Sequence, residues 1–178
     1  MGDFGVRTEP STIRFERVLP GPIERVWAYL PEPAKRARWL AAGPMDLVPG
    51  GRVELRFHNS ALSGEAEPVP ERWRDQDGGT MHGRVVACEP PRLLAYTWGE
   101  DQGEPSEVTF ELVSEGDEVR LVLTHRRLGD GSLMLCVASG WHTHLEVLAA
   151  ELAGRARPRF WPLHEVRERQ YEGILGLA

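Results

Sequence analysis

Apolar and polar residues alternate in six short stretches of the chain, which is the spacing of half-buried strands. The clearest stretch is 52–58, where Val53, Leu55 and Phe57 are separated by Glu54 and Arg56. The expected strands are 11–19, 52–58, 81–89, 92–98, 106–114 and 118–127. The last four follow one another through short turns, so they should pair as antiparallel hairpins, because a parallel crossover needs about a dozen connecting residues.

Helical spacing appears in two places. After Pro22, apolar residues recur every three or four positions, but Pro31 and Pro33 interrupt the pattern, so we expect two short helices with a bend between them. A long amphipathic helix is expected over 133–154, with Thr143 and Glu146 opposite its apolar stripe. The residues of that stripe are Met134, Val137, Ala138, Trp141, Leu145, Leu148 and Leu152.

This order of elements predicts an α+β fold. A six-stranded antiparallel sheet must bury the stripe of the long helix against its apolar face, and twist bends such a sheet into a cradle. We therefore expect one domain over 1–154, in which a curved sheet wraps around the C-terminal helix and leaves an apolar cavity near its ends. Residues 155–178, with a possible helix at 163–175, are expected to fold back on the same domain.

The segment 59–79 has no sustained periodicity. Such a long structureless connection inside a compact domain is unusual, so it is either disordered or a lid over the cavity. The sequence favours disorder.

Composition narrows the function classes. The chain has 178 residues and a formal net charge of -6, from 21 basic and 27 acidic residues. This balance lacks the basic footprint of a nucleic-acid-binding protein. No apolar run approaches the roughly 20 residues of a membrane span, and Cys88 and Cys136 have no close partner residues in sequence. We expect a cytoplasmic protein.

The chain resembles the helix-grip superfamily of START and plant pollen allergen (Bet v 1-like) proteins, and within it the Hsp90 ATPase activator-like group. The resemblance extends over about residues 11 to 154. It is carried by Pro22-Ile23-Glu24-Arg25-Val26-Trp27, Trp39, Gly50-Gly51, Glu89-Pro90-Pro91-Arg92-Leu93, Thr97-Trp98 and Gly140-Trp141-His142-Thr143-His144-Leu145. It implies one of several roles: binding of a hydrophobic ligand, a cyclase-type reaction, lipid transport or a cochaperone function. The resemblance does not choose among these roles, because members of the superfamily share no catalytic motif.

Aromatic and apolar side chains are the candidates for lining the cavity. His125 continues the alternation of Val119, Leu121 and Leu123, so its imidazole should point towards the cavity and have a hydrogen-bond partner. A structural partner is favoured over a ligand. The candidate ligand-binding residues are Trp39, Phe57, Tyr96, Trp98, Phe110, His125, Met134, Trp141, Leu145 and Leu148.

The spacings contain no motif for nucleophilic catalysis, phosphate binding or a thiolate cluster. His142 and His144 cannot share a metal ion, because helix residues two apart point about 200° from each other. His142 is expected to pair with Glu146 on the surface, and His144 to lie at the cavity rim or an interface. Acid/base catalysis by Glu111 or His125 stays open, and we expect neither a metal nor a cofactor.

The leading hypothesis is non-catalytic binding of a hydrophobic or aromatic small molecule. The first alternative is an enzyme of polyketide cyclase/dehydratase or hydrolase type that uses the same cavity and depends on His125 and Tyr96. The second alternative, a regulator of an Hsp90-type chaperone, follows only from the resemblance. Homodimerisation through the tail or a helix edge is a further expectation for this family.

Overall fold

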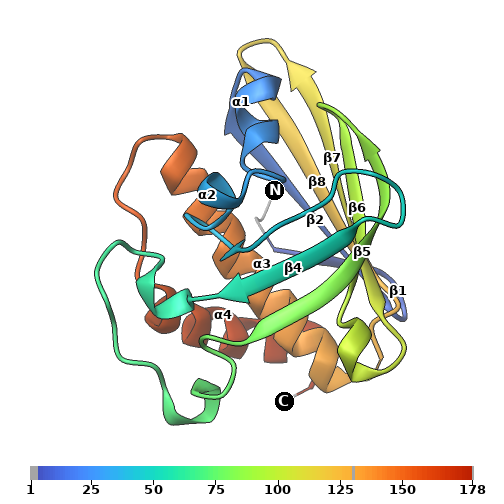
Figure 1. Ribbon diagram of the computed structural model, residues 1–178. Helices are drawn as coiled ribbons and strands as arrows, with labels where there is room; N and C mark the ends of the chain where they lie inside the picture. Colours follow the sequence, from blue (N-terminus) through green and yellow to red (C-terminus); the bar gives the residue numbers. More distant parts are fainter. Residues whose placement is uncertain (1–3, 130, 178) are drawn as a thin grey trace.

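One antiparallel sheet curves around the long helix α3, Gly131–Leu152, in the computed structural model, which describes residues 4–129 and 131–177 (Figure 1). The sheet order is β1-β2-β8-β7-β6-β5-β4-β3. The strands are β1 Val6–Glu9, β2 Thr12–Pro20, β3 Ala41–Ala42, β4 Arg52–Phe57, β5 Thr80–Glu89, β6 Leu93–Trp98, β7 Ser106–Glu115 and β8 Glu118–Arg126. The predicted α+β helix-grip fold is confirmed.

The expected number of six strands was too low, because the sheet has eight. Both additional strands lie at its edges. All four residues of β1 are exposed, and β3 has only two residues. Neither strand can therefore produce an alternation of buried and exposed positions that is detectable in the sequence.

The six longer strands match their predicted positions within one or two residues, because their buried faces follow the alternation. Strands β2 and β8 pair directly, with Phe15 opposite Leu123 and Ile13 opposite His125. These four side chains are almost completely buried. The first and the last strand of the predicted set thus pair next to the edge strand β1, and their pairing places His125 in the buried interior.

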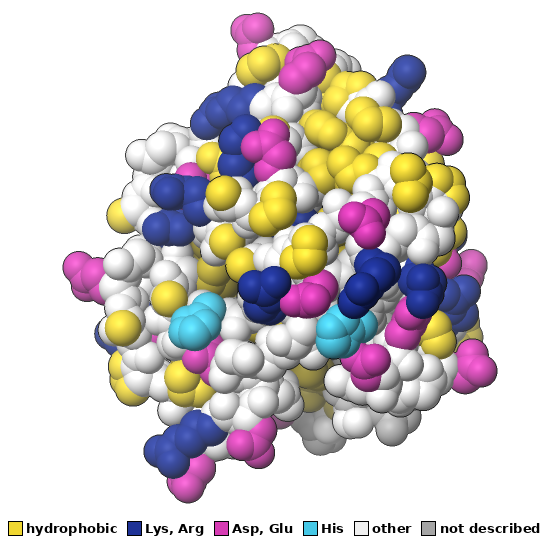
Figure 2. Space-filling model, viewed as in Figure 1, with side chains coloured by type: hydrophobic (Ala, Val, Ile, Leu, Met, Phe, Trp, Pro, Cys, Tyr) yellow, Lys and Arg dark blue, Asp and Glu magenta, His cyan; other side chains and the backbone are white. Residues whose placement is uncertain are grey.

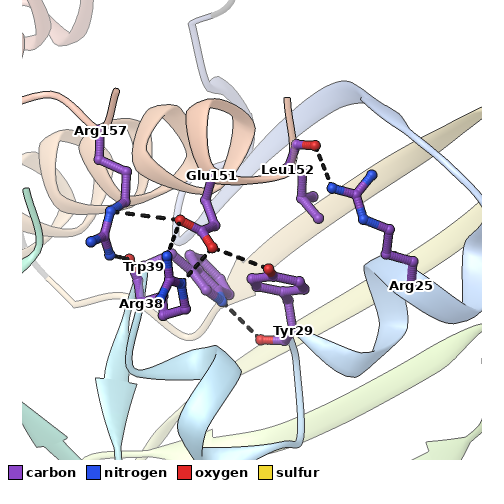
Figure 3. Close-up of polar contacts among 7 residues, drawn as sticks. All are labelled: Arg25, Tyr29, Arg38, Trp39, Glu151, Leu152 and Arg157. Carbon is purple, nitrogen blue, oxygen red and sulfur yellow. Dashed lines mark hydrogen bonds and ion pairs between the residues drawn. The ribbon is translucent and has the colours of Figure 1, made fainter. Parts of the chain in front are cut away.

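The two short helices are α1, Ile23–Ala28, and α2, Pro33–Arg36, as predicted. They are tied to the C-terminal end of α3 (Figure 3). The Tyr29 hydroxyl donates to Glu151 over 3.1 Å, and a guanidinium nitrogen of Arg25 donates to the Leu152 carbonyl over 2.6 Å. These hydrogen bonds hold the short-helix region against the C-terminal end of α3. The cavity described below lies beside the N-terminal half of the same helix.

Helix α4, Phe160–Leu175, covers the outer face of α3 (Figure 1). Thr143, expected opposite the buried stripe, is therefore fully buried. His142 does pair with Glu146, over 2.9 Å, but the expected surface position was wrong, since its side chain is 1% exposed and also contacts the Tyr171 hydroxyl.

The segment 59–79, hereafter the lid, follows a defined path, so the expectation of disorder was wrong. It contains two single turns, η1 Asn59–Ala61 and η2 Glu71–Trp73. The buried Glu67 carboxylate accepts hydrogen bonds from the backbone N–H of Trp161 and from Arg159, over 3.0 and 3.1 Å. These contacts, more than 90 residues apart in sequence, fasten the lid to the start of α4.

Charged side chains of both signs are interspersed over the face shown in Figure 2. This face has no continuous basic surface of the kind that binds a phosphate backbone. Among the described residues, no helix is long and apolar enough to cross a membrane.

Candidate ligand-binding site

A cavity of about 510 Å³ lies beside the N-terminal half of α3. The lid and α4 form one side of its wall, and the sheet forms the other. The lining residues from the sheet and its turns are Phe57, Thr80, Met81, Trp98, Gln102 and His125; from the lid they are Asn59, Trp73, Asp75, Gln76 and Gly79; from α3 and α4 they are Leu133, Cys136, Val137, Gly140, Trp141, His144, Phe160, Trp161 and His164.

Six aromatic side chains dominate the cavity wall, and four of them are tryptophans. Trp98 and Trp141 meet edge to face with ring centroids 5.2 Å apart, while Trp73 of the lid stacks on Trp161 of α4 at 6.0 Å. Among the lining residues that the structure describes, Asp75 is the only carboxylate, and none is a lysine or an arginine. The cavity is thus suited to an apolar, ring-containing molecule.

The structure separates the sequence-predicted residues into two groups. Phe57, Trp98, His125 and Trp141 line the cavity. The others belong to the buried core and do not line the cavity. These core residues are Trp39, Tyr96, Phe110, Met134, Leu145 and Leu148.

Sequence reasoning missed the wall contributed by the lid and α4. Trp73, Phe160 and Trp161 lie outside the elements predicted from sequence, and their aromatic character was the only available signal; His164 lies in the helix expected over 163–175 but was not expected to face the cavity. His144 was expected at the rim or at an interface, but it is 6% exposed and forms part of the cavity wall.

His125 has both ring nitrogens engaged in hydrogen bonds. Trp141 Nε1 donates to Nδ1 over 2.9 Å, so the neutral ring carries its proton on Nε2, which lies 2.7 Å from Ser106 Oγ. Burial lowers the pKa of His125 to about 3, so the ring is neutral at pH 7. The expected structural partner of His125 is therefore present twice over.

His144 is held by one nitrogen only. Its Nδ1 lies 2.7 Å from the Trp39 carbonyl oxygen, an acceptor, so Nδ1 carries the proton and Nε2 has the lone pair. Burial lowers the pKa of His144 to about 4, which keeps the ring neutral at pH 7. Nε2 has no hydrogen-bond partner among the residues that the structure describes.

His164 is the third histidine of the cavity wall. Its Nε2 lies 3.3 Å from Ser139 Oγ, and its Nδ1 is buried without a hydrogen-bond partner. Burial lowers the pKa of His164 to about 4. The described residues contain no group of three or more His, Cys, Asp or Glu side chains that could hold a metal ion.

Gly140 leaves space in the cavity wall from the middle of α3. A Cβ atom built on Gly140 would meet no atom within 4 Å, so no close contact with the rest of the chain requires glycine there. Glycine in a helix interior costs about 1 kcal/mol relative to alanine. The open volume beside Gly140 is part of the cavity.

Comparison with known families gives a match to the profile described as Activator of Hsp90 ATPase homolog 1-like protein, over residues 20–153. This region is well over half of the chain. The chain belongs to that family. The Hsp90 ATPase activator-like match ends before α4, so Phe160, Trp161 and His164 of the cavity wall lie outside the matched region.

Solved structures agree with the fold. The chain is similar to the protein encoded by gene BPP1335 from Bordetella parapertussis, with 52% identity over 96% of this chain and 90% of that one, and a TM-score of 0.81. CalU16 from Micromonospora echinospora has 21% identity over 99% of this chain and 97% of that chain, with a TM-score of 0.69. DynU16, from the dynemicin biosynthetic locus, has 19% identity over 84% of this chain and 50% of its own, with a TM-score of 0.63.

The two more distant similarities show the fold alone. No curated protein matches the chain in sequence. Function must therefore be argued from the cavity itself.

Proposed function

We propose that the protein binds an uncharged, hydrophobic or aromatic small molecule in the cavity beneath the lid. The observation that carries the proposal is the composition of the wall, in which six aromatic rings surround about 510 Å³. Ligand sites of small molecules commonly enclose about 300–1,000 Å³ and are lined mainly by apolar and aromatic groups.

The charges of the wall favour an uncharged ligand. In the described part of the chain no lysine or arginine side chain lines the cavity, and Asp75 would repel an anion. His125, His144 and His164 are neutral at pH 7, because burial lowers their pKa values to about 3, 4 and 4. A carboxylate or phosphate ligand would therefore lose its hydration without gaining a cationic partner.

Gly140 fits the same proposal. The backbone of α3 borders the cavity at this glycine, where a built Cβ would meet no atom within 4 Å. A planar ring can approach the helix closely there, whereas any larger side chain would occupy the cavity.

Binding is tested by thermal shift, tryptophan fluorescence and calorimetry, with 2-naphthol, anthracene and palmitate as probes. We expect the aromatic probes to raise the Tm and to change the emission of the cavity tryptophans, and palmitate to do neither. Gly140→Leu should fill the cavity and remove the response. Gly173→Leu is the matched control, because Gly173 is in α4, is exposed, and likewise has no atom within 4 Å of a built Cβ.

Failure of all aromatic probes to bind the unaltered protein at millimolar concentration would count against the proposal. An equal response of Gly140→Leu and the unaltered protein would place binding outside this cavity. We favour binding over the enzyme alternative because both nitrogens of His125 are already engaged. A chaperone partner rests on the family description alone, and a pull-down with cytosolic Hsp90 would test it.

A further inference from the structure

The three cavity histidines differ in what they can offer a ligand. Both nitrogens of His125 are hydrogen-bonded, and Nδ1 of His164 is sealed from solvent. His144 is the exception, because its Nδ1 is bonded to the Trp39 carbonyl and its Nε2 has no partner among the described residues. Nε2 of His144 is not among the polar atoms that the protein seals off, so it can accept a hydrogen bond from a molecule in the cavity.

We propose that the ligand is an aromatic molecule carrying a hydrogen-bond donor, such as a phenolic hydroxyl, and that this group donates to Nε2 of His144. This inference rests on the proposed function and narrows it. It assigns the polar contact of the cavity to a residue that the apolar pattern of α3 does not single out.

The orientation of the His144 ring is fixed by the hydrogen bond of its Nδ1 to the Trp39 carbonyl. The Trp39 carbonyl accepts from Nδ1, and Trp39 is held in turn by its indole Nε1, which donates to the Tyr29 carbonyl over 2.8 Å. Figure 3 shows this bond and the contact of Tyr29 with Glu151 near the end of α3. With Nδ1 directed at the carbonyl, Nε2 lies on the other side of the ring.

Aromatic rings surround His144 and define where the ligand ring would lie. The imidazole centroid is 4.7 Å from that of Phe160, 6.3 Å from Trp141 and 6.4 Å from Phe57, and all three side chains line the cavity. Gly140 lies one helical turn before His144, so both face the same side of α3. A ring packed over Gly140 would place a substituent close to Nε2.

Because the His144 ring is neutral with its proton on Nδ1, the ligand must supply the hydrogen-bond donor. A neutral ring with its proton on Nδ1 can only accept at Nε2. Burial lowers the pKa of this histidine to about 4, so an uncharged donor is preferred at neutral pH over an acid that would need to protonate the ring. A methyl ether of the same ring system presents no donor and should bind more weakly.

The test compares 2-naphthol with 2-methoxynaphthalene by calorimetry at pH 7, using the full chain. We expect 2-naphthol to bind about tenfold more tightly, the usual effect of one buried hydrogen bond. In His144→Asn this preference should fall to about twofold or less. Asparagine carries an amide nitrogen at the same number of bonds from Cβ as Nδ1, so it can keep the bond to the Trp39 carbonyl while it lacks the Nε2 acceptor.

His144→Phe is a second variant, which preserves a planar ring but removes both nitrogens. Comparing the two ligands within each variant cancels the effect of any general loss of stability. Imidazole ¹⁵N spectra give a readout independent of affinity: 2-naphthol should shift the unprotonated Nε2 resonance of His144, and 2-methoxynaphthalene should not.

Two outcomes are distinguishable. Equal affinity for both probes, with no change in His144→Asn and no shift of the Nε2 resonance, would overturn this inference and leave the proposed function intact. Absence of binding by either probe, together with no difference between the unaltered protein and Gly140→Leu, would overturn the proposed function and this inference with it.

Discussion

Nε1 of Trp141 donates a hydrogen bond to Nδ1 of His125 over 2.9 Å. The indole nitrogen can only donate, so Nδ1 of His125 can only accept, and the proton of the neutral ring is on Nε2. Nε2 therefore donates to Ser106 Oγ, 2.7 Å away. In a hydrolytic triad the third group is an acceptor, which leaves Nε2 able to take the serine proton. Here the polarity is reversed, so His125 cannot activate Ser106 as a nucleophile.

The first prediction is that Ser106 does not react with a fluorophosphonate probe, although it lies against a histidine. Intact-protein mass spectrometry after incubation at pH 7 would measure labelling, and a serine hydrolase would serve as the positive control. Imidazole ¹⁵N spectra should show the proton of His125 on Nε2. Covalent labelling at Ser106, or a proton on Nδ1, would contradict this assignment.

The same hydrogen bond gives a stability prediction. Trp141→Phe should lower the free energy of unfolding by about 1–3 kcal/mol, because it leaves Nδ1 of the buried His125 without a donor and removes part of a packed ring. Urea denaturation followed by circular dichroism would measure the change. Trp27→Phe, at a half-buried position on α1, is the control and should cost clearly less.

Acid should destabilise the protein before its carboxylates titrate. Burial lowers the pKa values of His125, His144 and His164 to about 3, 4 and 4, against an ordinary value of 6.5. Between these values the unfolded chain binds more protons than the folded protein, so stability falls as the pH falls. Each histidine contributes a loss of up to about 1.4 kcal/mol per pH unit below 6.5.

Urea denaturation at pH 7, 6 and 5 would measure this slope, because the lowered pKa values of the paired carboxylates Glu146 and Glu151 confine their own effect to more acidic conditions. His144→Phe should lessen the slope, since one buried histidine with a lowered pKa is absent. His142, whose pKa is also lowered mainly by burial, still contributes in this variant. A free energy of unfolding that stays constant from pH 7 to 5 would contradict the buried, neutral state of these rings.

The sheet and α3 could be predicted from sequence because their burial is periodic. Val53 and Leu55 are buried and Glu54 between them is not, so the alternation of apolar and polar residues matches the alternation of buried and less buried positions in the strand. The face of α3 that carries Thr143 could not be predicted in this way. Thr143 is completely buried in a helix on which α4 packs, and a helix pattern does not reveal a second element packed on its polar side.

The cavity was predictable in outline and only partly in detail. Trp98, His125 and Trp141 lie on periodic elements, and their side chains do line it. Trp73 and Trp161 come from segments far apart in sequence, which the buried Glu67 and the Arg72–Glu168 ion pair also join. Such long-range contacts between aperiodic segments leave no spacing signal.

Arg36 gives a prediction about the short-helix region. Its guanidinium group is 1% exposed and its hydrogen-bond partners are all backbone carbonyls, with no carboxylate among them. The carbonyls belong to Leu30, Pro31, Ala41 and Gly43. Arg36→Met should lower the free energy of unfolding by about 3 kcal/mol or more, because several buried acceptors would lose their donors at once.

Lys35→Met is the neighbouring control for Arg36→Met. Lys35 forms an exposed ion pair with Glu32, of a kind that contributes less than about 1 kcal/mol. Chemical denaturation of both variants would compare the two losses. Similar losses for the two variants would show that Arg36 does not hold this region together.

The attachment of the lid gives the last prediction. Glu67 accepts from the backbone N–H of Trp161 and from Arg159, and its side chain is 1% exposed. Glu67→Ala would leave the Trp161 N–H without this acceptor, so the lid should open more often and trypsin should cleave faster at Arg72 and Arg74 within it. Glu65→Ala, at an exposed position in the same segment, should leave the cleavage rate unchanged. Mass spectrometry would follow the cleavage, and equal rates in the two variants would contradict the anchoring role of Glu67. Faster cleavage in Glu67→Ala would show that this carboxylate holds the lid closed together with the Arg72–Glu168 ion pair to α4.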